Sequence, residues 1–214
     1  MAEGISLKTN NIVQLSVLIV LQLLMVSVIN QSTFNLSLLD ILKDTGGVML
    51  AVGVLSGWLS HLIPAELKSI FVFWRWRNVL PGHRFIQLAE KDRRIDIALL
   101  KARVPEYESL KLNNSEQNSY WYKEFYRPAN RQDEVASTHK SYLLYRDATA
   151  VSLVSAFALV IAKQAFGEQL LEVSYQSLWM FVASIIGFSI AARNAGQRMV
   201  TTAIAVRLTL NSIE

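Results

Sequence analysis

The most constraining feature of this chain is a set of four long apolar segments that carry no Asp, Glu, Lys or Arg. They run from Ile12 to Ile29, Thr45 to Ala65, Ala148 to Ala162 and Val173 to Ala192. A charged side chain at the centre of a membrane helix costs about 2.5–3.5 kcal/mol, and about 20 apolar residues cross the ~30 Å hydrocarbon core. The pattern therefore predicts an all-α polytopic membrane protein with four transmembrane helices in two hairpins.

The segment between the two hairpins is too charged for the interior of a bilayer. We expect a first hairpin over 1–65, a basic helical cytosolic insert over 66–147, and a second hairpin with a tail over 148–214. Eleven Lys and Arg residues lie near span ends on the insert side, against Lys43 and Lys163 on the other. The positive-inside rule then predicts that the insert and both termini are cytoplasmic. We expect the protein in a bacterial inner membrane.

Short helices, with little or no sheet, are expected inside the insert. Pro64 is suited to start a new helix, and Ile70–Arg77 mixes aromatic rings with arginines, which predicts a collar at the lipid headgroups. One helix is expected over Asp92–Val104, with a face made of Ile95, Leu99 and Ala102. A second is expected over Glu116–Tyr126 with Ser115 as its N-cap. The stretch 131–147 is expected to run unbroken into the third span.

Small residues recur at helical spacing in three of the four predicted spans. Lipid tails are as apolar as leucine, so membrane helices associate through close backbone contact and interhelical hydrogen bonds. The pattern predicts packing within one bundle or between the copies of a homo-oligomer. The residues expected to make these contacts are Gly53, Gly57, Ser152, Ser155, Ala183, Gly187 and Ala191.

Three polar side chains fall inside the predicted spans, namely Gln14, Gln22 and His61. Unsatisfied polar groups are costly in hydrocarbon. Gln22 is therefore expected to form an interhelical hydrogen bond to Ser56 or Ser155, and the alternative is a polar pore lining. His61 is expected to contact headgroups, and the alternative is proton transfer.

A cluster of basic side chains surrounds the turn expected at Pro81–Gly82. Its members, all within 20 residues, are Arg75, Arg77, His83, Arg84, Arg93 and Arg94. Arginine offers planar bidentate donors that match phosphate oxygens. The cluster predicts contact with anionic membrane lipids or, alternatively, a site for a nucleotide-like ligand. Nearby acids disfavour nucleic acid as a partner.

Other candidate chemistry in the insert is weaker. Asp92 and Asp96 stand four residues apart, as carboxylates that bind a cation or share acid–base work can do, but their basic neighbours favour salt bridges and a helix N-terminus. An aromatic set is expected to form the insert's core: Tyr120, Trp121, Tyr122, Phe125, Tyr126, Tyr142 and Tyr145. No HExxH, GxSxG, P-loop or GxGxxG motif is present, and the chain has no cysteine. We therefore predict no catalytic residue, metal ligand or cofactor.

Two stretches look family-defining, Trp74–Arg84 and Ser141–Asp147. The layout of two membrane hairpins around a compact basic insert resembles small multispan membrane subunits associated with bacterial anti-phage defence. The resemblance covers layout alone, and no functional residue is carried over from it.

Three functions follow as hypotheses. The first is a non-enzymatic, homo-oligomeric sensor or signalling subunit whose insert binds a cytosolic protein or an anionic ligand and alters membrane permeability. The second is a small transporter or channel lined by Gln22, Ser56 and Ser155. The third is a lipid-modifying enzyme that uses Asp92 and Asp96.

Overall fold

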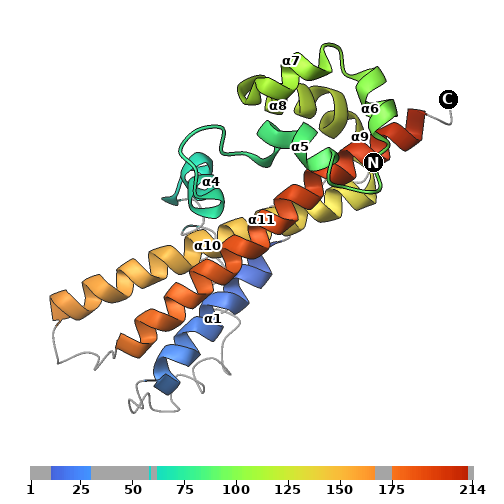
Figure 1. Cartoon of the computed structure of the whole chain (residues 1–214). Helices are drawn as coiled ribbons and strands as arrows, with labels where there is room; N and C mark the ends of the chain where they lie inside the picture. Colours follow the sequence, from blue (N-terminus) through green and yellow to red (C-terminus); the bar gives the residue numbers. More distant parts are fainter. Residues whose placement is uncertain (1–10, 30–57, 59–61, 167–174, 212–214) are drawn as a thin grey trace. The chain divides into compact units, whose positions relative to one another are not determined.

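A computed structural model describes residues 11–29, 58, 62–166 and 175–211, and the regular structure of these residues is helical (Figure 1), as the sequence predicts. The helices are α1 (Ile12–Ile29), α4 (Ala65–Phe73), α5 (Phe85–Ala89), α6 (Ile97–Arg103), α7 (Tyr107–Leu112), α8 (Asn114–Trp121), α9 (Arg127–Ala129), α10 (Asp133–Phe166) and α11 (Tyr175–Asn211). A 3₁₀ turn, η2 (Pro81–Arg84), and a π-helical turn, η3 (Tyr122–Tyr126), complete them. The predicted second span, 45–65, lies almost wholly outside the described residues.

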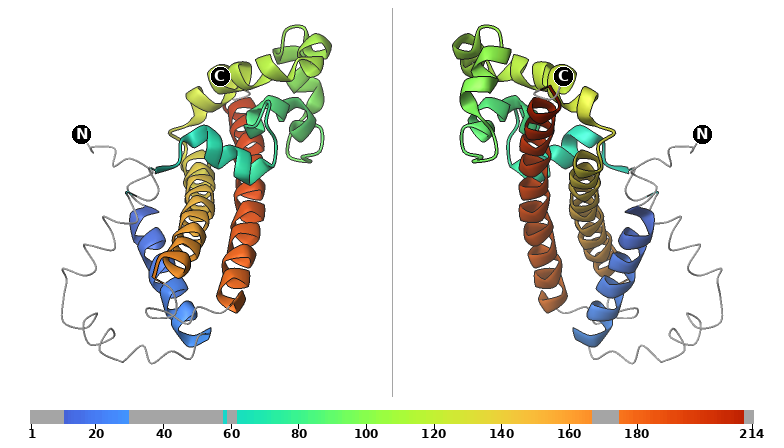
Figure 2. Two further views of the ribbon diagram at one scale, coloured as in Figure 1. Left: turned by 90° about the vertical axis from the view of Figure 1, so that its left-hand side faces the viewer. Right: turned by 90° about the vertical axis from the view of Figure 1, so that its right-hand side faces the viewer.

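Two helices are much longer than the others. α10 has 34 residues and α11 has 37, and both run without a break (Figures 1 and 2). At about 1.5 Å per residue they extend for roughly 50 and 55 Å. The continuity of α10 confirms the prediction that the stretch before Asp147 runs directly into the third predicted span.

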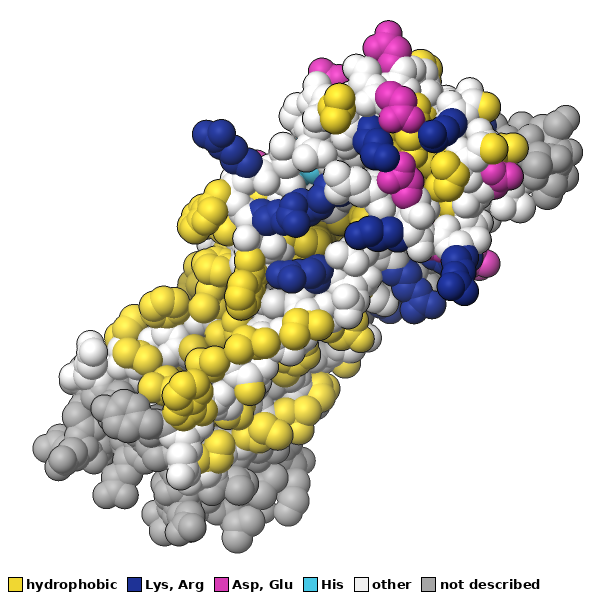
Figure 3. Space-filling model, viewed as in Figure 1, with side chains coloured by type: hydrophobic (Ala, Val, Ile, Leu, Met, Phe, Trp, Pro, Cys, Tyr) yellow, Lys and Arg dark blue, Asp and Glu magenta, His cyan; other side chains and the backbone are white. Residues whose placement is uncertain are grey.

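The chain divides into two compact units, each described here by itself. The apolar unit comprises Met1–Lys68 and Leu144–Ser189, and the basic unit comprises Ser69–Leu143 and Ile190–Glu214. The apolar unit holds five basic and seven acidic residues, whereas the basic unit holds sixteen and ten. The net charge of +4 therefore arises in the basic unit, over whose helices Lys and Arg side chains gather in Figure 3.

In the apolar unit, α1 is apolar on both faces. Its inner face buries Leu15, Ile19, Gln22 and Val26, which follow one helix stripe. Its other face is exposed and equally apolar, at Val13, Val17, Leu21 and Met25. A helix that is hydrophobic all round is typical of a membrane span or of the centre of a large core.

Gln22 forms the expected interhelical hydrogen bond, but with a different serine. Its Nε2 donates to Oγ of Ser152 on α10 at 2.7 Å, and both side chains are buried. The prediction of Ser155 was wrong because that residue is three positions further along α10, about 60° around the helix. Ser56, the other predicted partner, lies outside the described residues.

A buried ion pair joins α4 to α10 in the apolar unit. Nζ of Lys68 donates to Oδ1 of Asp147 at 2.9 Å, and the two side chains are 2% and 1% exposed. Nε and Nη2 of Arg146 donate to the same oxygen at 3.2 and 3.1 Å. Two cations thus compensate one carboxylate at the point where the charge-free part of α10 begins.

The basic unit has an aromatic core, as the sequence predicts. Phe85, Trp121, Phe125 and Tyr142 are buried, and the rings of Phe85 and Phe125 lie 5.7 Å apart. Nε1 of Trp121 donates to the carbonyl oxygen of residue 200 on α11 at 3.3 Å, which anchors this core on the C-terminal part of α11. Of the other predicted core residues, Tyr122 is half exposed. Tyr120 and Tyr126 are half-buried, and Tyr145, also half-buried, belongs to the apolar unit.

The turn predicted at Pro81–Gly82 is a buried 3₁₀ turn packed on α8. A Cβ at Gly82 would clash with Oδ1 of Asn118 and would lie 2.8 Å from the ring of Trp121. Glycine is therefore required here by close approach rather than by its backbone angles. Next to it, Oε1 of the fully buried Gln117 accepts from the backbone N–H of Ile86 at 3.4 Å, which ties α5 to α8.

Two local predictions were wrong. α6 begins at Ile97, because the carboxylate of Asp96 accepts from the N–H groups of residues 98 and 99 and caps the helix there. The buried positions are consequently Leu100 and Val104, whereas Leu99 is 44% exposed. Similarly, α8 begins at Asn114, and Ser115 donates to the side chain of Asn113 at 2.6 Å instead of capping.

By length and composition, two of the described helices are able to cross a membrane. They are Asp133–Ile161 and Gln176–Leu210, which contain most of the third and fourth predicted spans. The first predicted span coincides with α1 at both ends. The four-span arrangement itself stays a prediction.

Candidate functional site

The loop between α5 and α6 and the C-terminal part of α11 line an open hollow in the basic unit. Its volume is about 430 Å³. Its lining residues, which we call the basic hollow, are Leu88, Lys91, Asp92, Arg93, Arg94, Asn194, Gln197, Arg198 and Thr201. Four cations against one carboxylate give this lining a formal charge of +3.

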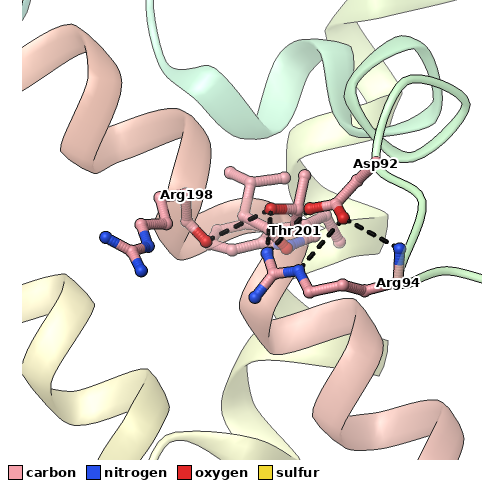
Figure 4. A network of polar contacts seen from close by, with 6 residues as sticks. Asp92, Arg94, Arg198 and Thr201 are labelled. Carbon is pink, nitrogen blue, oxygen red and sulfur yellow. Dashed lines mark hydrogen bonds and ion pairs between the residues drawn. The ribbon is translucent and has the colours of Figure 1, made fainter.

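Asp92 and Arg94 form the fixed part of the basic hollow (Figure 4). Nε and Nη2 of Arg94 donate to the two carboxylate oxygens of Asp92 at 3.0 and 2.7 Å. The backbone N–H of Arg94 donates to Oδ1 at 3.1 Å, and Nη2 also donates to Oγ1 of Thr201 at 3.1 Å. The Asp92–Arg94 pair therefore joins the loop to α11.

These contacts change the acidity of both groups. The hydrogen bond from Arg94, with a smaller contribution from Thr201, holds the pKa of Asp92 well below its usual range. The same bond raises the pKa of Arg94. Asp92 is thus a firmly ionised partner of Arg94 at neutral pH, which makes it a poor general acid.

Three cations of the hollow are free for an outside anion. Among the described residues, the side chains of Lys91, Arg93 and Arg198 have no hydrogen-bond or ion-pair partner. All three are exposed, and in Figure 4 the guanidinium of Arg198 extends away from the Asp92–Arg94 pair. Charge-assisted bonds from arginine are the ones that recognise phosphate and carboxylate groups most strongly.

The polar neighbours on α11 suit the same ligand class. Asn194 and Gln197 place two amide side chains beside Arg198 on one helix face, and Thr201 follows one turn later. Amide and hydroxyl donors add directional hydrogen bonds to an anion that the arginines attract. The arrangement can bind and neutralise an anion, and its one carboxylate is already engaged by Arg94.

The six basic side chains singled out in the sequence lie in different places. Arg93 and Arg94 line the basic hollow, whereas Arg75 and Arg77 are exposed in the segment after α4. Arg84 is the half-buried residue before α5. His83 lies in η2 with Nδ1 2.8 Å from the carbonyl oxygen of Asn114, which fits a tautomer that donates from Nδ1.

Sequence reasoning missed Lys91 and the whole α11 wall of the hollow. A signal for the wall was present, because residues 194, 197, 198 and 201 are polar and recur at spacings of three and four just beyond an apolar span. That stripe predicts a polar, solvent-exposed face on a helix. It does not predict that the face meets a loop about one hundred residues earlier in the chain.

The residues predicted to pack helices lie in mixed environments. Ser152 is buried against Gln22, and Ser155 and Ala191 are half-buried. Ala183 and Gly187 are exposed, and a Cβ at Gly187 would meet nothing within 4 Å. The other two predicted packing residues, Gly53 and Gly57, lie outside the described residues.

Among the intramembrane polar residues, Gln14 is exposed and Gln22 is buried. His61 lies outside the described residues. Oε1 of Gln22 has no hydrogen-bond partner among the described residues, in contrast to its Nε2 atom, which donates to Ser152.

The carboxylates that could serve an enzyme have structural partners. Asp92 pairs with Arg94 and Asp96 caps α6, which confirms the predicted salt bridging and helix N-terminal position. Within the described residues, no three His, Asp or Glu side chains converge where they could hold a metal ion.

No family model, curated protein or solved structure matches this chain. The assignment of the basic hollow as the candidate site therefore depends on the geometry of this chain alone.

Proposed function

We propose that this chain is a non-enzymatic, four-span membrane protein that senses an anionic ligand at the basic hollow and passes the binding event to its spans. The ligand class is a phosphate-bearing small molecule of the cytosol, for which a nucleotide is the natural example. The output is a change in bilayer permeability, made by a homo-oligomer in the inner membrane.

The continuity of α11 is the observation that supports this proposal best. Residues 194–201 of this helix line the basic hollow, and residues 175–192 of the same unbroken helix form its apolar part. A helix of about 55 Å is much longer than the ~30 Å hydrocarbon core. One continuous helix therefore contributes both a wall of the basic hollow and part of a predicted span, which supports a coupling between the two.

The exposure of apolar side chains supports the membrane part. Core helices of soluble proteins are mostly buried, whereas 33% and 17% of the two apolar windows are buried. Phe157, Ile161, Trp179 and Ile190 are each more than half exposed. In water, large exposed apolar surfaces promote aggregation, whereas in lipid they are solvated.

Direct binding to the reconstituted protein tests the ligand. In nanodiscs, pyrophosphate and ADP should bind by calorimetry, and Arg198→Gln should weaken binding about tenfold or more, because a hydrogen bond to a charged group contributes about 1.5–3 kcal/mol. The matched control is Arg131→Gln, which removes the same charge from an exposed position outside the hollow. Equal binding by the two variants would contradict the proposed site.

Dye release from proteoliposomes tests the output. Release that requires the ligand and is lost in Arg198→Gln supports the sensor. Steady ion flux without any ligand would instead favour the small transporter or channel, for which the unpartnered Oε1 of buried Gln22 is the supporting observation. Membranes that stay intact under every condition would remove the permeability output. The resemblance to anti-phage subunits stays a prediction.

A further inference from the structure

The segment that follows α4 exposes two indole rings. Trp74 and Trp76 are 68% and 83% exposed, and Arg75 and Arg77 between and after them are also exposed. Tryptophan is a large amphipathic side chain that is rarely presented to water in this way. Two such rings within three residues point to a surface that is covered in the working protein.

The backbone holds this segment in place. Trp74 has a left-handed backbone with φ of 53°, a conformation that is strained for a bulky residue. Nη2 of Arg193 on α11 donates to the carbonyl oxygen of Val72 at 3.1 Å, and its guanidinium lies 6.0 Å from the centroid of the Trp74 ring. Asn78 supplies a second left-handed residue, with φ of 50°. The rings are therefore presented by a built structure, not by a frayed helix end.

The exposed apolar surface continues back along α4. Phe71 is 40% exposed and lies in the last turn of α4, three residues before Trp74. An exposed apolar face that ends in tryptophan and is flanked by arginine has the composition of an interfacial helix. Indole rings favour the headgroup zone, and arginine is attracted to anionic lipid.

Charge favours lipid over a second copy of the chain. Neither Arg75 nor Arg77 has an ion-pair or hydrogen-bond partner among the described residues. A two-fold contact made by this surface would bring like charges together, since the same patch faces itself.

We propose that Phe71, Trp74 and Trp76, with Arg75 and Arg77, form a docking surface for the anionic lipid headgroups of the bilayer. This inference rests on the proposed membrane location. It assigns to α4 and the following segment a specific contact with lipid, independent of any ligand at the basic hollow.

A lipid-depth measurement tests the proposal, because the chain has no native cysteine. Phe71→Cys, carrying an NBD fluorophore, is reconstituted at one copy per nanodisc with or without phosphatidylserine, and quenching by spin-labelled lipid is recorded. We expect strong quenching with phosphatidylserine. The control is Leu112→Cys on α7, which is 88% exposed and has no neighbouring tryptophan or arginine, and which should stay unquenched.

Substitution of the two arginines is the second part of the test. Replacing Arg75 and Arg77 by Gln in the labelled protein should lower the ratio of docked to free segment about fivefold per arginine, the equivalent of ~1 kcal/mol at an anionic surface. Arg127→Gln with Arg131→Gln is the matched control, because both are exposed outside the segment. Equal quenching at positions 71 and 112, or quenching that ignores the arginines and the lipid charge, would overturn the proposal. Alkaline extraction of the same protein tests the membrane location separately. If the protein resists extraction, a negative quenching result contradicts the docking surface and not the membrane location.

Discussion

Asp92 is the residue on which the shape of the basic hollow depends most directly. Its carboxylate accepts three hydrogen bonds from Arg94 and fixes the guanidinium that also reaches Thr201. When Asp92 is protonated, the ion pair is lost and the loop is no longer held to α11 by a charged contact. The hollow should therefore have a stability that depends on pH.

The sign of this dependence follows from the lowered pKa of Asp92. The pair stabilises the fold at any pH above the unfolded value of about 3.9, and this contribution is lost as the pH falls below it toward the lower folded pKa. At pH 7, Asp92→Asn should cost about 1 kcal/mol, since Arg94 is half exposed and solvent weakens the pair. Melting curves in detergent from pH 7 to pH 3 should show the gap between wild type and variant closing below about pH 4.

The matched substitution is Glu124→Gln, which removes a carboxylate from an exposed position in η3. It should leave the pH profile of the wild-type protein unchanged. A gap between wild type and Asp92→Asn that stays constant down to pH 3 would show that the carboxylate does not act through its charge.

At the scale of single residues, the sequence predicted which side chains suit an anion better than it predicted which residues lie next to them. Arg93 and Arg94 were recognised as candidates for an anion because of their chemistry and local density. Arg198 was not recognised, because it is more than one hundred residues away in the chain. It reaches the same hollow only because Trp121 bonds to α11 and Thr201 of α11 bonds to the loop. Local spacing contains no information about that tertiary contact.

Among the described elements, α4 and α10 are joined by a deeply buried ion pair. Lys68 and Asp147 are nearly inaccessible, and Asp147 has Arg146 as a second cationic partner. Breaking a buried pair by removing one partner is costly, because the other charge is left uncompensated. The two ends of this pair are not equivalent, since two cations, Lys68 and Arg146, bond to the one carboxylate.

We therefore expect Asp147→Asn to be more destabilising than Lys68→Met. Asp147→Asn leaves both Lys68 and Arg146 without their carboxylate and should cost about 3–5 kcal/mol. In Lys68→Met, Asp147 keeps its bonds to Arg146, so the loss should be clearly smaller. Unfolding titrations in mixed micelles would measure both. An equal loss for the two variants would indicate that Arg146 does not support the pair.

Helix bounds could be predicted where charge marks them. α1 coincides with the predicted apolar stretch Ile12–Ile29, and α10 continues through the polar stretch before Asp147 because nothing in it breaks a helix. α6 was predicted too early, because Asp92 bonds to the N–H two residues on and turns the chain before Asp96 caps the helix. Side-chain bonds to the backbone of this kind compete with helix formation and are hard to rank from sequence.

For the whole molecule, the distribution of charge is the property that decides orientation. The basic unit holds sixteen of the 21 Lys and Arg residues. Residues near span ends that carry positive charge stay on the cytoplasmic side. The four-span proposal therefore commits the two connecting segments, 30–44 and 66–147, to opposite sides of the membrane.

Cysteine labelling in intact cells measures that commitment directly, because a chain without cysteine gives no background. A membrane-impermeant maleimide should label Asn35→Cys from outside, although this position lies outside the described residues. Leu112→Cys, 88% exposed on α7, should be labelled only in inverted vesicles or after detergent is added. Labelling of both positions from outside would mean that an even number of crossings, or none, separates position 35 from position 112, instead of the single predicted span. The arginine-rich unit would then face away from cytosolic phosphate ligands, and both the sensor and its proposed ligand would have to be given up.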